Sequence, residues 1–523
     1  MAAALVPGPA AEKPIREQVW VQTPVDSDAD GRPDRVAVRI IRPGSGPRVP
    51  AILEASPYFA GIHQAVNHTD LDRSARIPSS GLLDDYFVPR GYAVLSADSL
   101  GTGGSDGCPT SGGRNETLGI KAVVDWLNGR APAFDESGAA VTAAWTTGRT
   151  GMIGTSYNGT LPNAVATTGV PGLETIVPIA AISSWYDYYR ANGGVVAPGG
   201  YPGEDADVLA RAVLTRKNPK ACAAVMTRLE REQDRQTGDY NRFWAERDYL
   251  RDVDRVRASV FVVHGLHDEN VRTQQFGQWW DALAARGVPR KIWLHQGGHA
   301  DPAEVRREVW LATLDRWFGR WLKRLDTGIM REPMADVEVA PGRWETARNW
   351  PVPGSRPVPV RFDHPGTIRQ TFVDNPARTA ESLVAAGPNR SAYRTAKLTR
   401  DTRWSGRAEV TVRADLTGPS PYLTALLVDH GAASPTIVSR GWLDVRNRIS
   451  RDRTTPVVAG RTYQFRWKLQ PGDHVFAAGH RIGLVLISTE RDHTLRYPAG
   501  TVIGVRPGSL QLILDLAPGT ESR

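Results

Sequence analysis

The hexapeptide Gly-Thr-Ser-Tyr-Asn-Gly at residues 154–159 limits what this chain can fold into more than any other stretch. It fits the pattern Gly-x-Ser-x-Gly with one extra residue before the second glycine, which places a serine on a sharp turn between a strand and a helix. A Cβ at Gly154 would collide with the backbone across the turn, and Gly159 lets the helix pack closely against the strand. The pattern predicts Ser156 as a nucleophile, although an incidental serine in such a turn would fit it too.

A candidate acid and a candidate base follow Ser156, which needs both because a serine hydroxyl is a weak nucleophile. Residues 258–265 are a short apolar run closed by glycine, typical of a buried strand, and Asp268 follows directly. Residues 291–295 predict the next strand, which leads into a Gln-Gly-Gly-His loop ending at His299. Serine, acid, histidine is the order found in α/β-hydrolases, whose parallel strands end at one sheet edge. We therefore predict a Ser156–Asp268–His299 triad. The nearby histidines, each on a strand or on the wrong side of the acid, are His264, His267 and His295.

Two donors are also expected for the oxyanion of a tetrahedral intermediate. One is the backbone N–H of Tyr157, directly after the nucleophile. The second should come from the loop after an upstream strand, which residues 49–55 predict. That loop has no His-Gly-Gly-Gly run, but the hydroxyl of Tyr58 could replace the usual amide. A tyrosine that only packs against the loop is the alternative.

Four stretches together resemble the Xaa-Pro dipeptidyl-peptidases. They are the elbow, the run Ile-Ser-Ser-Trp-Tyr-Asp-Tyr-Tyr-Arg at 182–190, Asp-Glu-Asn-Val at 268–271 and Gln-Gly-Gly-His at 296–299. The cocaine esterases and the α-amino-acid ester hydrolases share the same core. The resemblance runs from about residue 17 to the C-terminus. It implies a proline-specific serine exopeptidase that releases N-terminal Xaa-Pro dipeptides through an acyl-enzyme, and we expect no metal or organic cofactor.

The resemblance also implies which residues contact a peptide with proline at position two. Trp185, Tyr188 and Val271 match the wall of a hydrophobic slot for the proline ring, and Tyr58 matches the second oxyanion donor.

A free N-terminus requires a further contact, because an aminopeptidase must hold an α-ammonium at a fixed distance from its nucleophile. By resemblance, Glu204 and Asn270 match the carboxylate and the amide that do so. Asp205 and Asp207 are rivals of Glu204, and a solvated acidic loop is the alternative. These residues discriminate between hypotheses, because an esterase or acyltransferase acting on a neutral ester with the same triad needs no such clamp. A carbohydrate-binding protein with a relic hydrolase core is the other hypothesis, and an intact triad argues against it.

The chain has 523 residues and needs more than one hydrophobic core. We expect an α/β-hydrolase core at 17–183 and 258–340, interrupted by a helical lid at 184–257. From 341 to 523, short alternating apolar runs recur between Gly- and Pro-rich turns, which predicts a β-sandwich. The resemblance implies that this sandwich is a jelly roll.

Charge and composition exclude several classes of partner. The net charge of +8 comes from 64 Lys and Arg against 56 Asp and Glu, and no basic run gathers it, so we expect no nucleic-acid partner. No stretch approaches the ~18 apolar residues of a membrane span. The aspartate-rich turn at 26–34 mimics a calcium loop, but Ala37 stands where a bidentate glutamate is required, so Asx turns explain it without a metal.

Two weaker features of the sequence bear on the cellular compartment. Residues 1–11 are rich in small side chains and resemble the segment after a signal peptide, so we expect a secreted enzyme, with a cytoplasmic one as the alternative. Cys108 and Cys222 are the only cysteines, and a bridge between them would tie the lid to the core. Two free buried thiols are the alternative. Whether the protein forms a homo-oligomer stays open.

Overall fold

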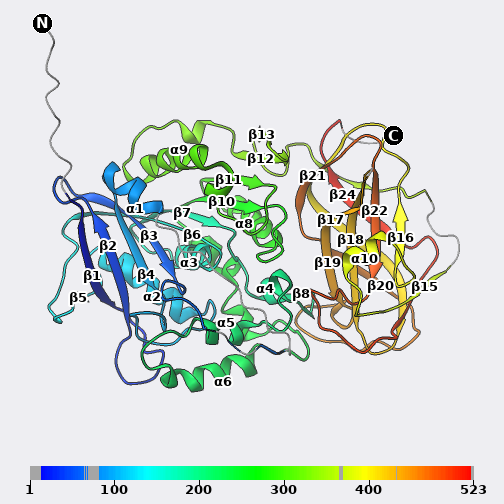
Figure 1. Ribbon diagram of the computed structural model, residues 1–523, viewed down its shortest axis with the longest axis horizontal. Helices are drawn as coiled ribbons and strands as arrows, with labels where there is room; N and C mark the ends of the chain where they lie inside the picture. Colours follow the sequence, from blue (N-terminus) through cyan, green and yellow to red (C-terminus); the bar gives the residue numbers. More distant parts are fainter. Residues whose placement is uncertain are drawn as a thin grey trace, which may run out of the picture.

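The computed structural model of the chain (Figure 1) describes residues 13–63, 65, 67–68, 82–363, 369–431 and 433–519. Residues 1–11, where the sequence predicts the segment after a signal peptide, lie outside these ranges. The described part contains the predicted α/β-hydrolase core, a helical insertion and a β-sandwich, which is drawn on the right in Figure 1. No helix in the described ranges is long and apolar enough to cross a membrane.

A sheet of 11 strands forms the centre of the hydrolase core. Its strands follow the order β13, β12, β11, β10, β7, β6, β3, β4, β2, β1 and β5. All neighbours from β4 to β12 are parallel, and antiparallel strands flank them. The bounds are β1 Ile15–Gln22, β2 Arg35–Arg42, β3 Val49–Ser56, β4 Ala93–Asp98, β5 Ala133–Phe134, β6 Thr146–Thr155, β7 Leu173–Ile179, β10 Ser259–Gly265, β11 Arg290–His295, β12 Ala335–Ala340 and β13 Arg343–Ala347.

Strand β13 extends this sheet past residue 340, where the sequence predicts that the core ends. The strand pairs antiparallel with β12, but most of its side chains are exposed or half-buried. An edge strand without a buried apolar face gives almost no alternating hydrophobic pattern, which is why sequence alone does not place it.

The sheet has a reversal of strand order at β3, which pairs with β4 on one side and β6 on the other. In parallel sheets such a point opens a crevice at the carboxyl ends of the strands. Ser156 follows β6 directly, so the predicted nucleophile lies at this crevice.

Helices cover both faces of the sheet. Successive residues of a strand point to opposite faces, and in the buried strands both sets of side chains are apolar, so each face needs a cover. Leu53 belongs to the core beneath α2, α3 and α8, whereas its neighbour Ile52 packs on the face covered by α1 and α9. The bounds are α1 Leu82–Phe87, η1 Val88–Arg90, α2 Arg114–Trp126, α3 Tyr157–Ala166, α8 Gln274–Ala285, α9 Pro302–Leu322 and η5 Ile329–Arg331.

The insertion between β7 and β10 contains short helices and one small hairpin. Its elements are α4 Tyr186–Tyr189, β8 Arg190–Ala191, β9 Gly194–Val195, η2 Pro198–Gly200, α5 Ala206–Val213, η3 Pro219–Cys222, α6 Ala223–Glu232, α7 Arg242–Ala245 and η4 Tyr249–Arg255. The predicted disulfide between Cys108 and Cys222 is present and joins η3 to the loop after β4. The lid is therefore fastened covalently to the core.

The C-terminal region packs two antiparallel sheets around its own apolar core. Strand β17 is the centre of the larger sheet, and the smaller follows the order β16, β22, β18, β19. The bounds are β14 Arg356–Pro359, β15 Gln370–Val373, α10 Ala380–Ala385, β16 Ser391–Arg394, β17 Thr402–Thr417, β18 Tyr422–His430, β19 Thr436–Asp444, η6 Val445–Asn447, β20 Tyr463–Lys468, β21 Gly472–Phe476, β22 Arg481–Ile487, β23 Val502–Val505 and β24 Gln511–Leu516.

Candidate active site

Ser156 lies between β6 and α3 with φ 66° and ψ −125°, a conformation that side chains other than glycine rarely adopt. Its N–H donates to the carbonyl of Ile179 at 2.9 Å, which fixes the turn against β7. A Cβ at Gly154 would lie 2.6 Å from the backbone of Asn158, and one at Gly159 would lie 2.5 Å from the carbonyl oxygen of Gly154. Both glycines are therefore required for the predicted reasons.

The predicted acid and base contact each other directly. Nδ1 of His299 lies 2.7 Å from Oδ2 of Asp268, and Oδ1 of Asp268 accepts the N–H groups of Asn270 and Val271, each at 2.9 Å. Burial alone would lower the pKa of His299, but the charge of Asp268 and the hydrogen bond to it outweigh burial, so the pKa is raised. The imidazole is thus oriented as a general base requires.

The other three histidines have backbone partners instead. Nε2 of His264 lies 2.6 Å from the carbonyl of Val271, and burial lowers its pKa to about 4. Nδ1 of His295 accepts the N–H of Gly297 at 3.1 Å, and Nδ1 of His267 lies 2.7 Å from a backbone carbonyl. Of these four histidines, only His299 lies within hydrogen-bond distance of the Asp268 carboxylate; Nε2 of His264 is 3.8 Å from Oδ2.

Tyr157 directly follows the nucleophile, and Tyr58 lines the same cavity as Ser156. The N–H of Tyr157 belongs to the first turn of α3, where backbone donors have no partner within the helix. The ring of Tyr58 is 5.9 Å from the ring of Tyr157, edge to face. Burial, helped by the charges of Glu204 and Glu116, raises the pKa of Tyr58, so its hydroxyl keeps its proton. It can therefore donate to a developing negative charge.

Ser156, His299 and several predicted peptide contacts line one cavity of about 1040 Å³. The predicted contacts on its wall are Tyr58, Tyr188, Glu204 and Asn270. Among the described residues, the His299 ring has a single hydrogen bond, to Asp268. The bond between base and nucleophile often tightens only when substrate binds, and both groups share this cavity.

Glu204 differs from the acidic residue that follows it. The hydroxyl of Tyr189 donates to Glu204 at 2.9 Å, and Glu204 forms no salt bridge among the described residues. Burial, with a contribution from Asp205, raises the pKa of Glu204 to about 7. Asp205 is fully buried and already paired, at 3.0 Å with Arg190 and 2.9 Å with Arg235.

Asp207 is occupied as well. It lies 2.8 Å from Nε2 of His68, accepts from Gln233 at 2.6 Å and is 3.8 Å from Arg211. Of the three rival acids, only Glu204 lines the cavity, and it has no cationic partner within the described part of the chain.

The residues that match the proline slot divide into two layers. Tyr188 lines the cavity, and its hydroxyl donates to Oδ1 of Asn270 at 2.6 Å. Trp185 and Val271 are fully buried and do not line the cavity. The Trp185 ring contacts that of Tyr188 edge to face at 5.8 Å. Direct contact of Trp185 or Val271 with a proline ring therefore stays a prediction.

Three carboxylates near the elbow were not found by sequence reasoning. Glu116 accepts the hydroxyl of Tyr157 at 2.6 Å and so fixes the first residue of α3. Glu54 and Asp301 contact residues on either side of Ser156 and line the cavity. Asp301 directly precedes Pro302, and an aspartate before a proline is a sequence pattern that indicates the start of a helix. Glu54 lies inside a strand and Glu116 inside a helix, and no local sequence pattern marks either residue as part of a site.

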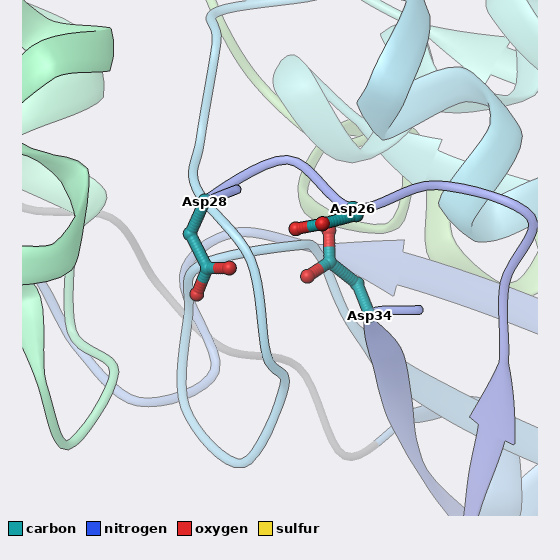
Figure 2. A group of neighbouring side chains, drawn as sticks. All are labelled: Asp26, Asp28 and Asp34. Carbon is teal, nitrogen blue, oxygen red and sulfur yellow. The ribbon is translucent and has the colours of Figure 1, made fainter. Parts of the chain in front are cut away.

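The aspartates of the β1–β2 turn also come together. Figure 2 shows Asp26, Asp28 and Asp34, whose nearest carboxylate oxygens lie within 4.8 Å of one another. Asp34 accepts two hydrogen bonds from Ser27, Asp28 pairs with Arg216, and Asp26 accepts two backbone N–H groups of the same turn. The Asx turns that the sequence predicts are made by Asp28 and Asp30, whose carboxylates accept the N–H groups two residues further on, of Asp30 and Arg32.

Comparison with known proteins covers most of the chain. The family model described as X-Pro dipeptidyl-peptidase (S15 family) matches residues 30–301, and that of the X-Pro dipeptidyl-peptidase C-terminal non-catalytic domain matches 327–521. A protein of Bacillus anthracis named "Putative Xaa-Pro dipeptidyl-peptidase" is 48% identical over 526 residues, which are 96% of this chain and 88% of that protein. The Xaa-Pro dipeptidyl-peptidase of Ligilactobacillus salivarius is 30% identical over 92% of this chain and 75% of its own.

A solved structure supports the same fold. An α-amino acid ester hydrolase superposes with a TM-score of 0.72 over 98% of both chains, at 18% identity. With two matching domain models and relatives of this identity, the chain belongs to the X-Pro dipeptidyl-peptidase (S15) family.

Proposed function

We propose that this protein is a serine exopeptidase that releases N-terminal Xaa-Pro dipeptides through an acyl-enzyme. The observation that carries the proposal is Glu204, a carboxylate in the same cavity as Ser156 and His299 that forms no salt bridge with any described residue. A half-buried carboxylate in this state favours a substrate that supplies a positive charge. The α-ammonium of a peptide is such a charge, and holding it fixes how many residues precede the cut bond.

The proposed reaction begins when His299 takes the proton of Ser156, whose Oγ attacks the carbonyl carbon of residue two. Asp268 orients and stabilises the imidazolium. The Tyr58 hydroxyl and the Tyr157 N–H donate to the oxyanion. His299 then gives its proton to the leaving amine, and the shortened peptide departs. Water, activated by His299, attacks the acyl-enzyme, releases the dipeptide and restores Ser156.

The preference for proline at position two is supported by the aromatic wall near the lid. Tyr188 is held from behind by Trp185 and from its hydroxyl by Asn270. A rigid apolar face suits the compact, rigid pyrrolidine ring of proline, because neither surface has to reorder when they meet.

The proposal is tested by kcat/KM on Ala-Pro-p-nitroanilide, its N-acetylated form, Ala-Ala-p-nitroanilide and p-nitrophenyl acetate. We expect the free-amine proline substrate to be hydrolysed best, because it alone satisfies both Glu204 and the aromatic wall. Equal rates on the free and acetylated substrates would contradict the dipeptidyl-peptidase and leave the esterase or acyltransferase alternative standing.

We further propose that the enzyme is secreted. The Cys108–Cys222 disulfide supports this, since such bonds persist in oxidising compartments and are rare in the cytosol. Fractionation of the producing cells should recover the oxidised enzyme outside the cytosol; a reduced enzyme confined to the cytosol would contradict the proposal.

A further inference from the structure

The catalytic cavity continues past Ser156, away from the lid. Its lid end is lined by Tyr188, Gly199, Tyr201, Glu204 and Leu209. Its other end is lined from α1 and α9, by Leu83, Ala303, Trp310, Leu311 and Leu314. Figure 1 shows α1 and α9 on the opposite side of α3 from α5 and α6. If the N-terminus of a peptide lies at Glu204, the residues after the cut bond leave towards α9.

Two carboxylates lie where this second end begins. Nδ2 of Asn158 donates to Oε1 of Glu54 at 3.0 Å, and Oγ1 of Thr155 donates to Oδ2 of Asp301 at 2.8 Å. Thr155 directly precedes Ser156, and Asn158 follows it by two residues. Both carboxylates are therefore anchored to the turn that holds the nucleophile.

The charged side chains at this end are mostly acidic. Besides Glu54 and Asp301 they are Asp85, Glu304 and Arg307. Within the described ranges, none of the four carboxylates forms a salt bridge. Burial, helped by the charge of Asp301, raises the pKa of Glu54 to about 7, although the hydrogen bond from Asn158 acts in the opposite direction. A cation placed beside Glu54 would relieve this cost of ionisation.

We propose that Glu54 and Asp301 form a subsite that selects a positively charged residue at position three of the substrate, directly after the cut bond. This inference rests on the proposed function, which supplies the direction of the peptide. A lysine or arginine would neutralise the carboxylates, while Leu83 and Ala303 offer apolar surface to its methylene stem. Glutamate at position three, or the free carboxylate of a tripeptide, would be repelled.

The test is competition among peptides Ala-Pro-Xaa-Ala-Ala-amide with lysine, glutamine or glutamate as Xaa, with depletion followed by mass spectrometry. Each mixture gives ratios of kcat/KM within one sample, so the amount of folded enzyme cancels. The wild-type enzyme should prefer lysine over glutamate by about ten- to a hundredfold, with glutamine between them. Ala-Pro-Ala-amide should likewise be cleaved faster than the free acid Ala-Pro-Ala.

Variants then assign the preference to the subsite. In Glu54→Gln, the lysine-to-glutamate ratio should fall at least about threefold, because one of the two anchored charges is lost. Glu308→Gln removes an exposed carboxylate of α9 that does not line the cavity, and should leave the ratio unchanged. Equal wild-type rates on the three peptides, or an unchanged ratio in Glu54→Gln, would overturn the subsite alone. Failure to cleave any peptide or Ala-Pro-p-nitroanilide would overturn the proposed function and the subsite with it.

Discussion

The two ends of the catalytic cavity each hold a glutamate whose pKa is raised to about 7, but their surroundings differ. At the lid end, the nearby Asp205 and Asp207 are paired with arginines, whereas Glu204 forms no salt bridge among the described residues. At the α9 end, Glu54 and Asp301 lie together, and neither has a cationic partner among the described residues.

This difference explains how one cavity can combine strict and graded recognition. Under the proposed function, the single charge of Glu204 at the lid end defines one point for the α-ammonium of a substrate. Several unpaired carboxylates at the α9 end create a negative field that favours cations without fixing one position. A precise site for an ammonium group therefore needs two things: one carboxylate without a partner, and arginine partners for the acids next to it.

The largest effect is expected from removing the nucleophile, Ser156, which lies between the two ends of the cavity. Ser156→Ala should lower kcat by about 10⁴- to 10⁶-fold for every substrate, whichever end its charge occupies. Its thermal unfolding should match that of the wild type, since the hydroxyl contributes nothing to the core. More than a tenth of the wild-type activity in this variant would show that Ser156 is not the nucleophile.

The next effect concerns the paired acid at the lid end. Asp205→Asn leaves Arg190 without its buried carboxylate, so the free energy of unfolding should fall by about 3–5 kcal/mol, measured by urea denaturation. Asp326→Asn breaks an exposed pair with Arg331 and serves as the control, with no expected change in the urea midpoint. An unchanged stability in Asp205→Asn would mean that Asp205 is not part of the structural framework.

A smaller effect should separate Glu204 from its paired neighbours. Glu204→Gln should lower kcat/KM for Ala-Pro-p-nitroanilide by about 30- to 1000-fold, the loss of a charge-assisted contact, and leave the N-acetylated substrate nearly unaffected. Glu232→Gln, exposed on α6 of the same lid, should change neither rate. Equal losses on both substrates would point to a structural role for Glu204.

The catalytic edge could be predicted from sequence because each of its residues follows a local pattern. Ser156, Asp268 and His299 each lie in the turn or loop that follows a predicted strand, and the structure brings all three to one edge of the sheet. At the lid end, sequence alone does not show which acid is unpaired, because the partners of Asp205 and Asp207 are distant in the sequence. Asp207 is occupied by His68, which lies 139 residues away in sequence, and no local pattern reveals such a pair.

The carboxylates at the α9 end cannot be predicted from sequence for a related reason. Glu54 lies inside an apolar run that correctly predicts a strand, and a single acid there gives no signal of its own. Only the parallel pairing of β3 with β6 brings it beside Ser156. Trp185 and Val271, which the resemblance matches to a proline slot, are fully buried and do not line the cavity, so their contact with a proline ring stays a prediction.

The smallest effect is a pH dependence that belongs to the lid end alone. Burial raises the pKa of Glu204 to about 7, so its carboxylate form, which binds the ammonium, is lost as the pH falls through 7. The peptide's α-amino group has a pKa of about 8, so the charged partner is lost as the pH rises. The ratio of kcat/KM for Ala-Pro-p-nitroanilide to that for its N-acetylated form should therefore peak near pH 7.5 and fall about sixfold at pH 6 and at pH 9.

The ionisation of His299 and of Glu54 affects both substrates equally and so does not change this ratio, because both substrates need the same base and carry the same leaving group. In Glu204→Gln the acidic limb should vanish. A wild-type ratio that stays constant between pH 6 and 8 would mean that another group holds the ammonium.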